Sequence, residues 1–369
     1  SEEVKRFWRE RVEEVAGQPI IYTLGMRGVH DGRMNGAKTV DEQREVLTRV
    51  LADQRTMLAE LVDTALTRIP QVFIPYKEVL DVYNSGLSVP EDITLMWCDD
   101  NYGYIRHLPD SVERLRPGGN GLYYHVSYWG RPHDYLWLPS THPVLMATEL
   151  LRAYDACNRD MWVLNVGDIK PAEYLTELFM DIAWDPEQVR AQGVRGHMEQ
   201  FMSREFGKHR AESLTDLMMD YYHLAYIRRP EFMAHTRTEE SNPKYKRPTS
   251  LPWSEEYVNK RIKAYETLVA DCDRLANNDD DARADVWYQL VEYPVKAAAY
   301  MNHKWCYAQL ARRGAGDDYW LKADECHQMI VSATKQYNEA MADGKWNKMM
   351  NYHPRNLAAY DMAPRGTYE

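Results

Sequence analysis

The chain has 369 residues, enough for two or three domains with large cores. Its 45 Lys and Arg against 56 Asp and Glu give a formal net charge of −11, which argues against nucleic acid or an anionic membrane as the main partner. No apolar run approaches the roughly 18 residues that a membrane-spanning helix needs, so no such segment is expected.

The first half alternates between two kinds of pattern. Residues 1–17 predict a charged amphipathic helix and lack the apolar core of a signal peptide. Short apolar runs then predict strands at residues 19–24, 72–75, 93–98, 122–124 and 161–164. The clearest helix between them covers residues 39–68. Continuous apolar strands that alternate with helices predict a buried parallel sheet.

After Pro171 the strand signal disappears. Helices are predicted over residues 172–183, 187–206, 210–227, 254–276, 283–313 and 318–342. Pro294 is expected to kink the fifth of these helices, and residues 228–253 predict a long surface loop. The predicted fold class is therefore α/β followed by all-α, with an α/β part at residues 1–187 and an α-helical bundle at residues 188–369.

The aromatic composition has two interpretations. The chain has 26 Tyr and 11 Trp but 6 Phe, so most of its aromatic rings carry a polar atom. Such side chains suit the binding of sugar rings, and they equally suit a wet surface and an ordinary core. Composition alone favours a wet surface and an ordinary core over sugar binding.

Polar residues follow each predicted strand at its carboxyl end. The clusters are Gly25–Asp31, Tyr76–Glu78, Asp99–Tyr102, His125–Trp129 and Asn165–Asp168. Taken singly, each has a structural explanation as an ion pair, a helix cap or a core histidine. In a (β/α) barrel, however, the carboxyl ends of the strands form one rim that carries the reactive groups, so we expect these clusters to act together.

Together these clusters supply carboxylates, an Arg, a His and aromatic rings. This set is typical of an acidic, aromatic-lined pocket in which a glycosidic bond is hydrolysed. In such a pocket two carboxyl groups flank the bond, and one of them gives a proton to the leaving oxygen. The chain contains no G-x-S-x-G, H-E-x-x-H or P-loop motif, which disfavours esterase, zinc peptidase and nucleotide hydrolase activities. An alternative for Asp99-Asp100-Asn101 is a site for a hard divalent cation, which prefers oxygen ligands.

These motifs resemble those of the glycoside hydrolase family 115 α-glucuronidases, which debranch xylan. The resemblance is carried by Thr23–Gly28 with Asp31, Pro75–Val79, Leu95–Asn101, Tyr123–Tyr128, Val163–Pro171, Leu290–Ala297 and Gly344–Met350. It implies a partial (β/α)8 TIM-type barrel with strands four to eight, followed by the helical bundle. It also implies that the chain is a fragment of a parent enzyme with three further βα units and an α/β domain upstream, and a β-sandwich downstream.

The resemblance implies a hydrolase without metal or cofactor that removes glucuronic acid or its 4-O-methyl ether from O-2 of xylose in glucuronoxylan, with inversion. Its pocket residues carry over to Arg27, Asp31, Tyr76, Glu78, Asp99, Asn101, His125, Tyr128 and Asn165. On top of this, we assign Glu78 as the general acid and Asp31 or Asp99 as the residue that activates water. Arg27 is the candidate clamp for the uronate carboxylate.

The expected partners are glucuronoxylan or glucurono-xylo-oligosaccharides, with no nucleic acid and no membrane, and the parent enzyme is a candidate homodimer. The parent is expected to be secreted or periplasmic because xylan is an extracellular polymer. One alternative is a truncated, non-catalytic half-barrel that binds carbohydrate or mediates assembly. Another is a different exo-glycosidase on the same barrel.

Overall fold

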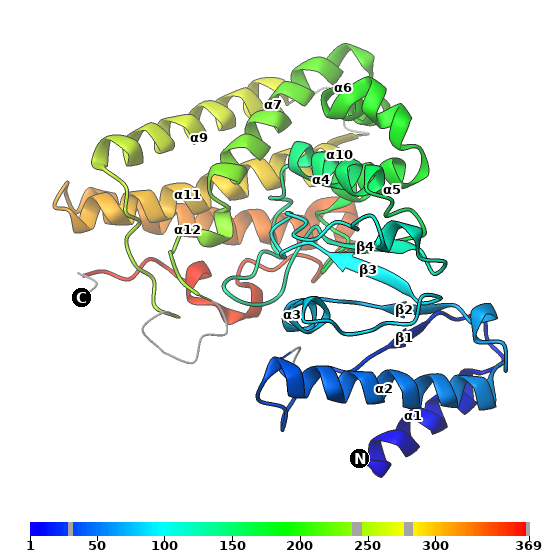
Figure 1. Ribbon diagram of the computed structural model, residues 1–369. Coiled ribbons are helices and arrows are strands. Elements are labelled where there is room, and N and C mark those ends of the chain that lie inside the picture. The colour runs from blue at the N-terminus through cyan, green and yellow to red at the C-terminus, as the bar shows by residue number, and fades with distance from the viewer. Residues whose placement is uncertain (29–31, 238–245, 277–282, 367–369) are drawn as a thin grey trace. The chain divides into compact units, whose positions relative to one another are not determined.

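The computed structural model describes residues 1–28, 32–237, 246–276 and 283–366, and its elements are labelled in Figure 1. The chain divides into two compact units. The first comprises Ser1–Tyr124 and Glu149–Leu164, and the second comprises His125–Thr148 and Asn165–Glu369. Among the described helices, none combines the length and the apolar character that a membrane span requires.

The first unit is built on a parallel sheet with the strand order β1-β2-β3-β4-β5. The strands are β1 Tyr22–Leu24, β2 Gln71–Phe73, β3 Thr94–Cys98, β4 Asn120–His125 and β5 Met161–Asn165. In the register of the sheet, Leu24 lies opposite Phe73, and Leu95 lies opposite both Phe73 on one side and Asn120 on the other. All five predicted strands are confirmed, and they form part of a (β/α) barrel that a helical region follows.

Four helices accompany these strands: α1 Glu2–Val15, α2 Val40–Leu61, α3 Glu78–Asn84 and α4 Pro143–Asp155. Helix α2 begins at a capping box, in which Thr39 and Glu42 each accept a hydrogen bond from the other's backbone N–H. The predicted helix over residues 39–68 is too long. It ends at Leu61 because Asp63 pairs with Arg68 and accepts the backbone N–H of Ala65, which forms a turn.

The core of the first unit lies where α2 and α3 pack against the first three strands. It includes Leu47, Leu51 and Leu58 of α2, Val79 and Val82 of α3, and Leu24, Phe73, Leu95 and Trp97 of the sheet. All of these side chains are buried, so hydrophobic burial fixes the register that positions the strand ends.

Strand β4 starts within the glycine-rich segment Pro117–Gly121. A Cβ atom at Gly121 would lie 2.5 Å from the carbonyl oxygen of Met161, the first residue of β5. Glycine at this position therefore lets β4 and β5 approach each other, and the glycine-rich segment belongs partly to the sheet.

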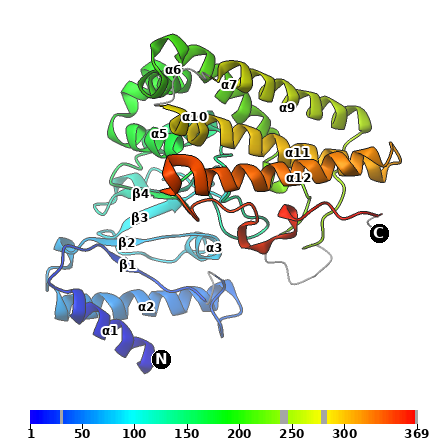
Figure 2. The same cartoon turned by 180° about the vertical axis from the view of Figure 1, so that it is seen from behind.

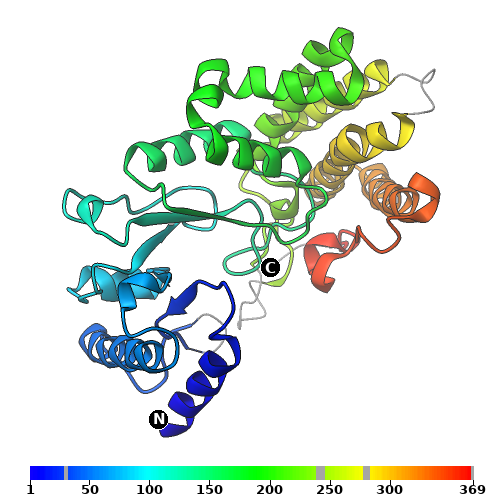
Figure 3. The ribbon, with the colours of Figure 1, turned by 90° about the vertical axis from the view of Figure 1, so that its right-hand side faces the viewer.

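The second unit is mainly helical. Its helices are α5 Glu173–Trp184, α6 Pro186–Phe206, α7 Lys208–Ile227, α9 Glu255–Leu275, α10 Ala284–Trp287, α11 Tyr293–Arg312 and α12 Asp318–Lys335. Helices α11 and α12 lie side by side and antiparallel, as Figures 2 and 3 show. The predicted loop at residues 228–253 contains a 3-10 turn at Pro230–Phe232, and residues 238–245 of it lie outside the described residues.

The predicted helix over residues 283–313 is interrupted just before its proline. Tyr288–Glu292 form a π-helical turn between α10 and α11, and Pro294 is in the first turn of α11. Proline has no N–H to donate back along the helix, so the chain changes its hydrogen-bond pattern there. The structure thus shows a change of helix type before Pro294, and the kink expected at Pro294 stays a prediction. The last predicted helix also ends early, at Lys335, and a second π-turn covers Gln336–Ala340.

Most of the largest fully buried side chains are Tyr and Trp. They are Trp97, Trp137, Tyr124, Tyr135, Tyr221, Tyr222, Tyr265, Tyr293, Tyr337 and Tyr360, with Phe73 and Phe179. Several of their polar groups have partners inside: the Tyr293 hydroxyl, for example, contacts Trp137 Nε1 at 3.2 Å and Thr334 Oγ1 at 3.0 Å. The interpretation of the aromatic composition as core packing is confirmed for these residues.

The C-terminal segment is anchored to α11 through backbone carbonyls. Buried Lys304 donates from Nζ to the carbonyl oxygen of Asp361 at 2.8 Å, and Trp305 Nε1 donates to that of Ala359 at 3.1 Å. Burial lowers the pKa of Lys304 to about 7. Between these two contacts lies Tyr360, whose ring packs edge-to-face on Trp137 with centroids 5.5 Å apart.

Candidate active site

Arg27 and Glu78 form a bidentate ion pair at the carboxyl ends of β1 and β2. Arg27 Nε lies 2.9 Å from Glu78 Oε1, and Arg27 Nη2 lies 3.1 Å from Glu78 Oε2. Their side chains are 21 % and 15 % exposed, so the pair is shielded from bulk water without being sealed off. Glu78 is the first residue of α3, which places its carboxylate near a helix N-terminus. The structure thus brings together the candidate acid and the candidate clamp.

Tyr76 and Asn101 form a second contact at the ends of β2 and β3. The Tyr76 hydroxyl donates to Asn101 Oδ1 at 2.5 Å, and the Arg27 guanidinium lies 5.0 Å from the centre of the Tyr76 ring. Lys77 and Asn101 have φ angles of 50° and 73°, in the left-handed region. Such strain costs of the order of 1–3 kcal/mol per residue and concentrates at functional sites, which supports a functional role for these loops.

Asp99 and its neighbour Asp100 have different surroundings. Asp99 is buried, and its Oδ2 accepts the backbone N–H of Gly103 at 3.0 Å. Asp100 accepts a hydrogen bond from Arg106 Nη2 at 2.7 Å and another from the backbone N–H of Tyr102. Asp100 is therefore engaged in its own turn and ion pair. The remaining candidate carboxylate, Asp31, lies outside the described residues.

His125, Tyr128 and Asn165 belong to the second unit. His125 is the last residue of β4, and its ring meets Tyr128 edge-on with centroids 5.5 Å apart. Tyr128 exchanges backbone hydrogen bonds with Tyr135, which folds residues 128–135 back on themselves. Asn165 is the last residue of β5, and its carbonyl accepts the N–H of Val126 at 3.1 Å. Backbone pairing therefore holds the loop after β4 against the end of β5.

His133 supports this loop from inside. Its Nδ1 donates to the carbonyl oxygen of Asp134 at 2.7 Å, so its Nε2, 3.1 Å from Thr236 Oγ1, accepts the hydroxyl proton. Asp134 in turn accepts the N–H of Gly130 at 2.7 Å and pairs with Arg355, which is 221 positions away in the chain. Arg355 is not among the residues predicted from the sequence, since nothing in its sequence neighbourhood indicates so distant a partner.

Acid should destabilise the fold partly through His133. Burial lowers the pKa of this imidazole from 6.5 to about 4, so the unfolded chain binds one more proton than the folded chain between these values. The stability that neutral His133 supports is complete above pH 6.5 and is lost as the pH falls towards 4. We expect His133→Gln to remove this contribution. The slope of the free energy of unfolding against pH should then decrease by up to about 1.4 kcal/mol per pH unit.

Urea unfolding between pH 6.5 and 4 measures this slope in both proteins. Other buried histidines, such as His327, whose pKa burial also lowers to about 4, are present in both proteins and contribute equally to both slopes. Equal slopes would therefore show that His133 does not contribute to the acid sensitivity.

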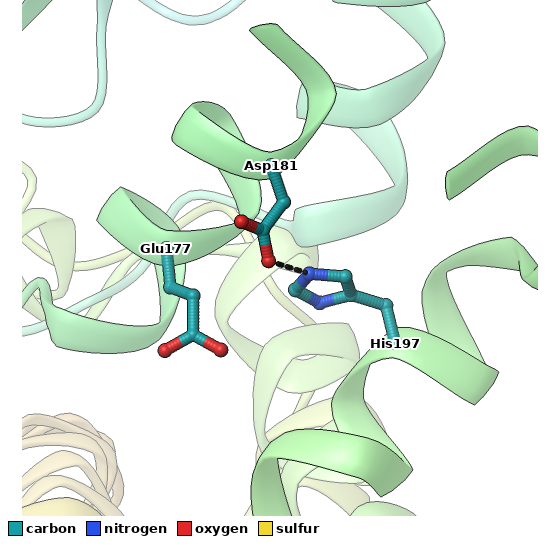
Figure 4. A group of neighbouring side chains, drawn as sticks. All are labelled: Glu177, Asp181 and His197. Carbon is teal, nitrogen blue, oxygen red and sulfur yellow. Dashed lines mark hydrogen bonds and ion pairs between the residues drawn. The ribbon is translucent and has the colours of Figure 1, made fainter. Parts of the chain in front are cut away.

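Among the described residues, one cluster consists of side chains of the types that bind metal ions: Glu177, Asp181 and His197 (Figure 4). His197 Nε2 lies 3.0 Å from Asp181 Oδ2, while both oxygens of Glu177 accept hydrogen bonds from Arg204, at 2.9 and 2.7 Å. A bidentate arginine already neutralises Glu177, so we interpret the group as a contact between α5 and α6.

A partial (β/α) barrel that carries carboxylates, an arginine, tyrosine and amide side chains at its strand ends has the features of the barrel glycoside hydrolases as a class. The chain belongs to glycosyl hydrolase family 115, whose family model matches residues 1–232.

A solved structure described as "A novel family GH115 4-O-Methyl-alpha-glucuronidase, BtGH115A, with specificity for decorated arabinogalactans" is similar over nearly the whole chain. The two share 52 % sequence identity with a TM-score of 0.95, over 99 % of this chain and 48 % of that one. This chain therefore spans about half the length of that relative. A comparison with curated proteins finds no match.

Proposed function

We propose that this chain forms part of the active site of an α-glucuronidase that releases glucuronic acid, or its 4-O-methyl ether, from a polysaccharide. The observation that carries the proposal is the Arg27–Glu78 pair at the ends of adjacent parallel strands, beside the Tyr76–Asn101 contact. The 52 % identity to a 4-O-methyl-α-glucuronidase supports the same activity. In this proposal residues 1–187 are the C-terminal part of the catalytic barrel, and residues 188–369 are its helical bundle.

In the proposed mechanism Glu78 is the general acid, and Arg27 couples it to the substrate. A uronate carboxylate has the same two-oxygen geometry as Glu78 and suits the same Nε–Nη2 edge of Arg27. Its entry would displace Glu78 from that edge. Glu78, released from Arg27, is the group that gives a proton to the leaving oxygen in this proposal.

Water attacks the anomeric carbon in the other half of the reaction. Asp99 is the candidate base that the structure describes, because its carboxylate is buried and held by the Gly103 N–H; Asp31 remains the alternative. As the C–O bond to the leaving sugar breaks, its oxygen takes the proton of Glu78 and the base takes a proton from water. Direct attack by water inverts the anomeric centre. Tyr76, Asn101, His125, Tyr128 and Asn165 are the proposed sugar-binding residues.

Two polysaccharides are candidate substrates. The motifs of the chain resemble enzymes that act on glucuronoxylan, whereas the solved relative is described as specific for decorated arabinogalactans. Both carry a uronic acid as a side chain, so Arg27 and Glu78 would act alike on either, and the neighbouring sugar would decide between them.

Release of uronic acid from both polysaccharides tests the proposal. The assay compares this chain with a chimera in which the 369 residues replace the matching half of the solved relative. We expect the chimera to release uronic acid, and the preferred polysaccharide identifies the substrate. A folded chimera that releases none from either polysaccharide would contradict the proposal and favour a non-catalytic, carbohydrate-binding role.

A further inference from the structure

A cavity of about 260 Å³ lies within the second unit, where three segments meet. The loop after β4 contributes Trp129 and Trp137, the loop after β5 contributes Asp168 and Lys170, and the C-terminal segment contributes Met349 and Arg355. Its wall is mostly apolar and aromatic with a few polar groups, as is usual for small-molecule sites. Its volume is near the lower end of the usual range of about 300–1,000 Å³, which suits a single sugar unit.

The cavity adjoins the candidate sugar-binding residues of the same unit. Trp129 directly follows Tyr128, and Asp168 is three positions after Asn165. The two loops are fastened together by Gly167, whose N–H donates to Ser127 Oγ at 2.6 Å. A Cβ atom at Gly167 would lie 2.6 Å from Leu136 Cδ2, so glycine is needed for this close approach.

Both cations of the cavity wall already face carboxylates. Arg355 pairs with Asp134, and Lys170 Nζ lies 3.0 Å from Glu173 Oε1. Asp168, by contrast, accepts no hydrogen bond from the residues that the structure describes, and partial burial raises its pKa. The wall therefore offers a carboxylate acceptor for hydroxyl groups, and a second carboxylate brought by a ligand would be repelled by it.

Trp129 offers an apolar face. It is 62 % exposed although it is a large aromatic residue, and the Arg355 guanidinium lies 4.1 Å from its ring centre. The chain holds Arg355 and Asn356 in the left-handed region, with φ of 55° and 54°. Strain of this kind persists where the surroundings enforce it, and here the enforced conformation places Arg355 on Trp129.

We propose that this cavity binds one neutral pyranose of the polysaccharide, a unit that does not itself react. The apolar C–H face of the sugar packs on Trp129, and its hydroxyl groups donate to Asp168. The identity of the sugar as part of a glucuronidated polymer rests on the proposed function, whereas the neutral-pyranose site rests on the cavity alone.

Binding of uncharged probes to the full 369-residue chain tests this site without requiring catalysis. The probes are xylotriose and galactotriose, with free glucuronic acid as the charged comparison, and calorimetry measures their affinity. We expect a neutral trisaccharide to bind, Trp129→Ala to weaken it at least tenfold, and Asp168→Asn to weaken it severalfold. Trp184→Ala is the matched control: Trp184 is 91 % exposed, in the same unit, and does not line the cavity. Its affinity should equal that of the unchanged chain.

Three outcomes would overturn the proposal: no neutral binding at millimolar concentration, equal loss in the Trp184 control, or binding of glucuronic acid in preference to the trisaccharides. Thermal melting shows whether Trp129→Ala remains folded, and Asp168→Asn, which preserves shape, gives an independent reading. Uronic acid release by the chimera separates the two hypotheses. If the chimera releases uronic acid but the chain binds no neutral trisaccharide, the cavity proposal alone is refuted. If the chain binds a neutral trisaccharide, Trp129→Ala abolishes that binding and the chimera is inactive, the cavity proposal is supported and the proposed reaction is refuted.

Discussion

Replacing Glu78 with Gln is expected to lower uronic acid release by about 10²–10⁴-fold, the usual contribution of a general acid. Gln keeps the shape of the side chain and can accept a hydrogen bond from Arg27, but it cannot give up a proton to the leaving oxygen. Release from the preferred polysaccharide, measured in the chimera with and without Glu78→Gln, gives the ratio. Thermal melting of both proteins checks that the fold remains.

Asp92→Asn is the matched control for this variant. Asp92 pairs with Arg55 at 2.9 Å, and the two side chains are 18 % and 17 % exposed, close to the values of the Arg27–Glu78 pair. It precedes β3 and thus lies at the amino ends of the strands, away from the proposed chemistry. We expect Asp92→Asn to keep most of the activity. Equal losses in the two variants would mean that Glu78 acts through the stability of its ion pair, and an active Glu78→Gln variant would remove it from the mechanism.

Replacing Tyr360 with Ala is expected to reduce the free energy of unfolding of the second unit by about 3–5 kcal/mol, as for other buried aromatic residues. Tyr360 is 2 % exposed and packs edge-to-face on Trp137. Its removal leaves a cavity beside the C-terminal segment, which helix α11 holds through Lys304 and Trp305. Urea unfolding followed by tryptophan fluorescence measures the loss.

Tyr360→Phe separates the ring from its hydroxyl group. This variant keeps the packing on Trp137 and removes a hydroxyl group that makes no hydrogen bond to the residues that the structure describes, so we expect a loss well below that of Tyr360→Ala. A similar small loss in Tyr360→Ala would show that the C-terminal segment contributes little to the stability of the unit, contrary to its burial and backbone contacts.

Local patterns located most of the regular structure. The five apolar runs of the first half are strands. The reason is clearest for β2, whose three residues are all buried, since a parallel strand covered on both faces must be apolar along its length. The six helical patterns of the second half are helices, but the ends of the helices in both halves were less predictable. The helix over residues 39–68 ends at Leu61 because Asp63 binds Arg68, and the helix over residues 283–313 is divided by a π-turn before Pro294. Helix ends depend on individual side-chain hydrogen bonds, which a periodic pattern does not encode.

The candidate residues were likewise recognisable as types and positions. Arg27, Glu78, Asp99 and Asn101 follow strands of the predicted sheet, and the family that they suggested is confirmed. Their pairing was not predictable. The candidate clamp Arg27 holds Glu78 rather than standing apart from it, and of the adjacent acids Asp99 and Asp100, one is buried and the other pairs with Arg106.

Periodicity and short motifs are enough to predict the alternation of strands and helices, the helical second half, the polar strand ends and the family, because neighbouring residues specify each of them. Which side chains meet depends on the tertiary structure: Arg27 with Glu78, Tyr76 with Asn101, and Arg355 with Asp134 across 221 positions. Contacts between distant segments depend on how whole helices and strands pack. The burial of apolar faces fixes the relative positions of these elements, and buried polar groups must then form hydrogen bonds with the groups that this packing brings near them.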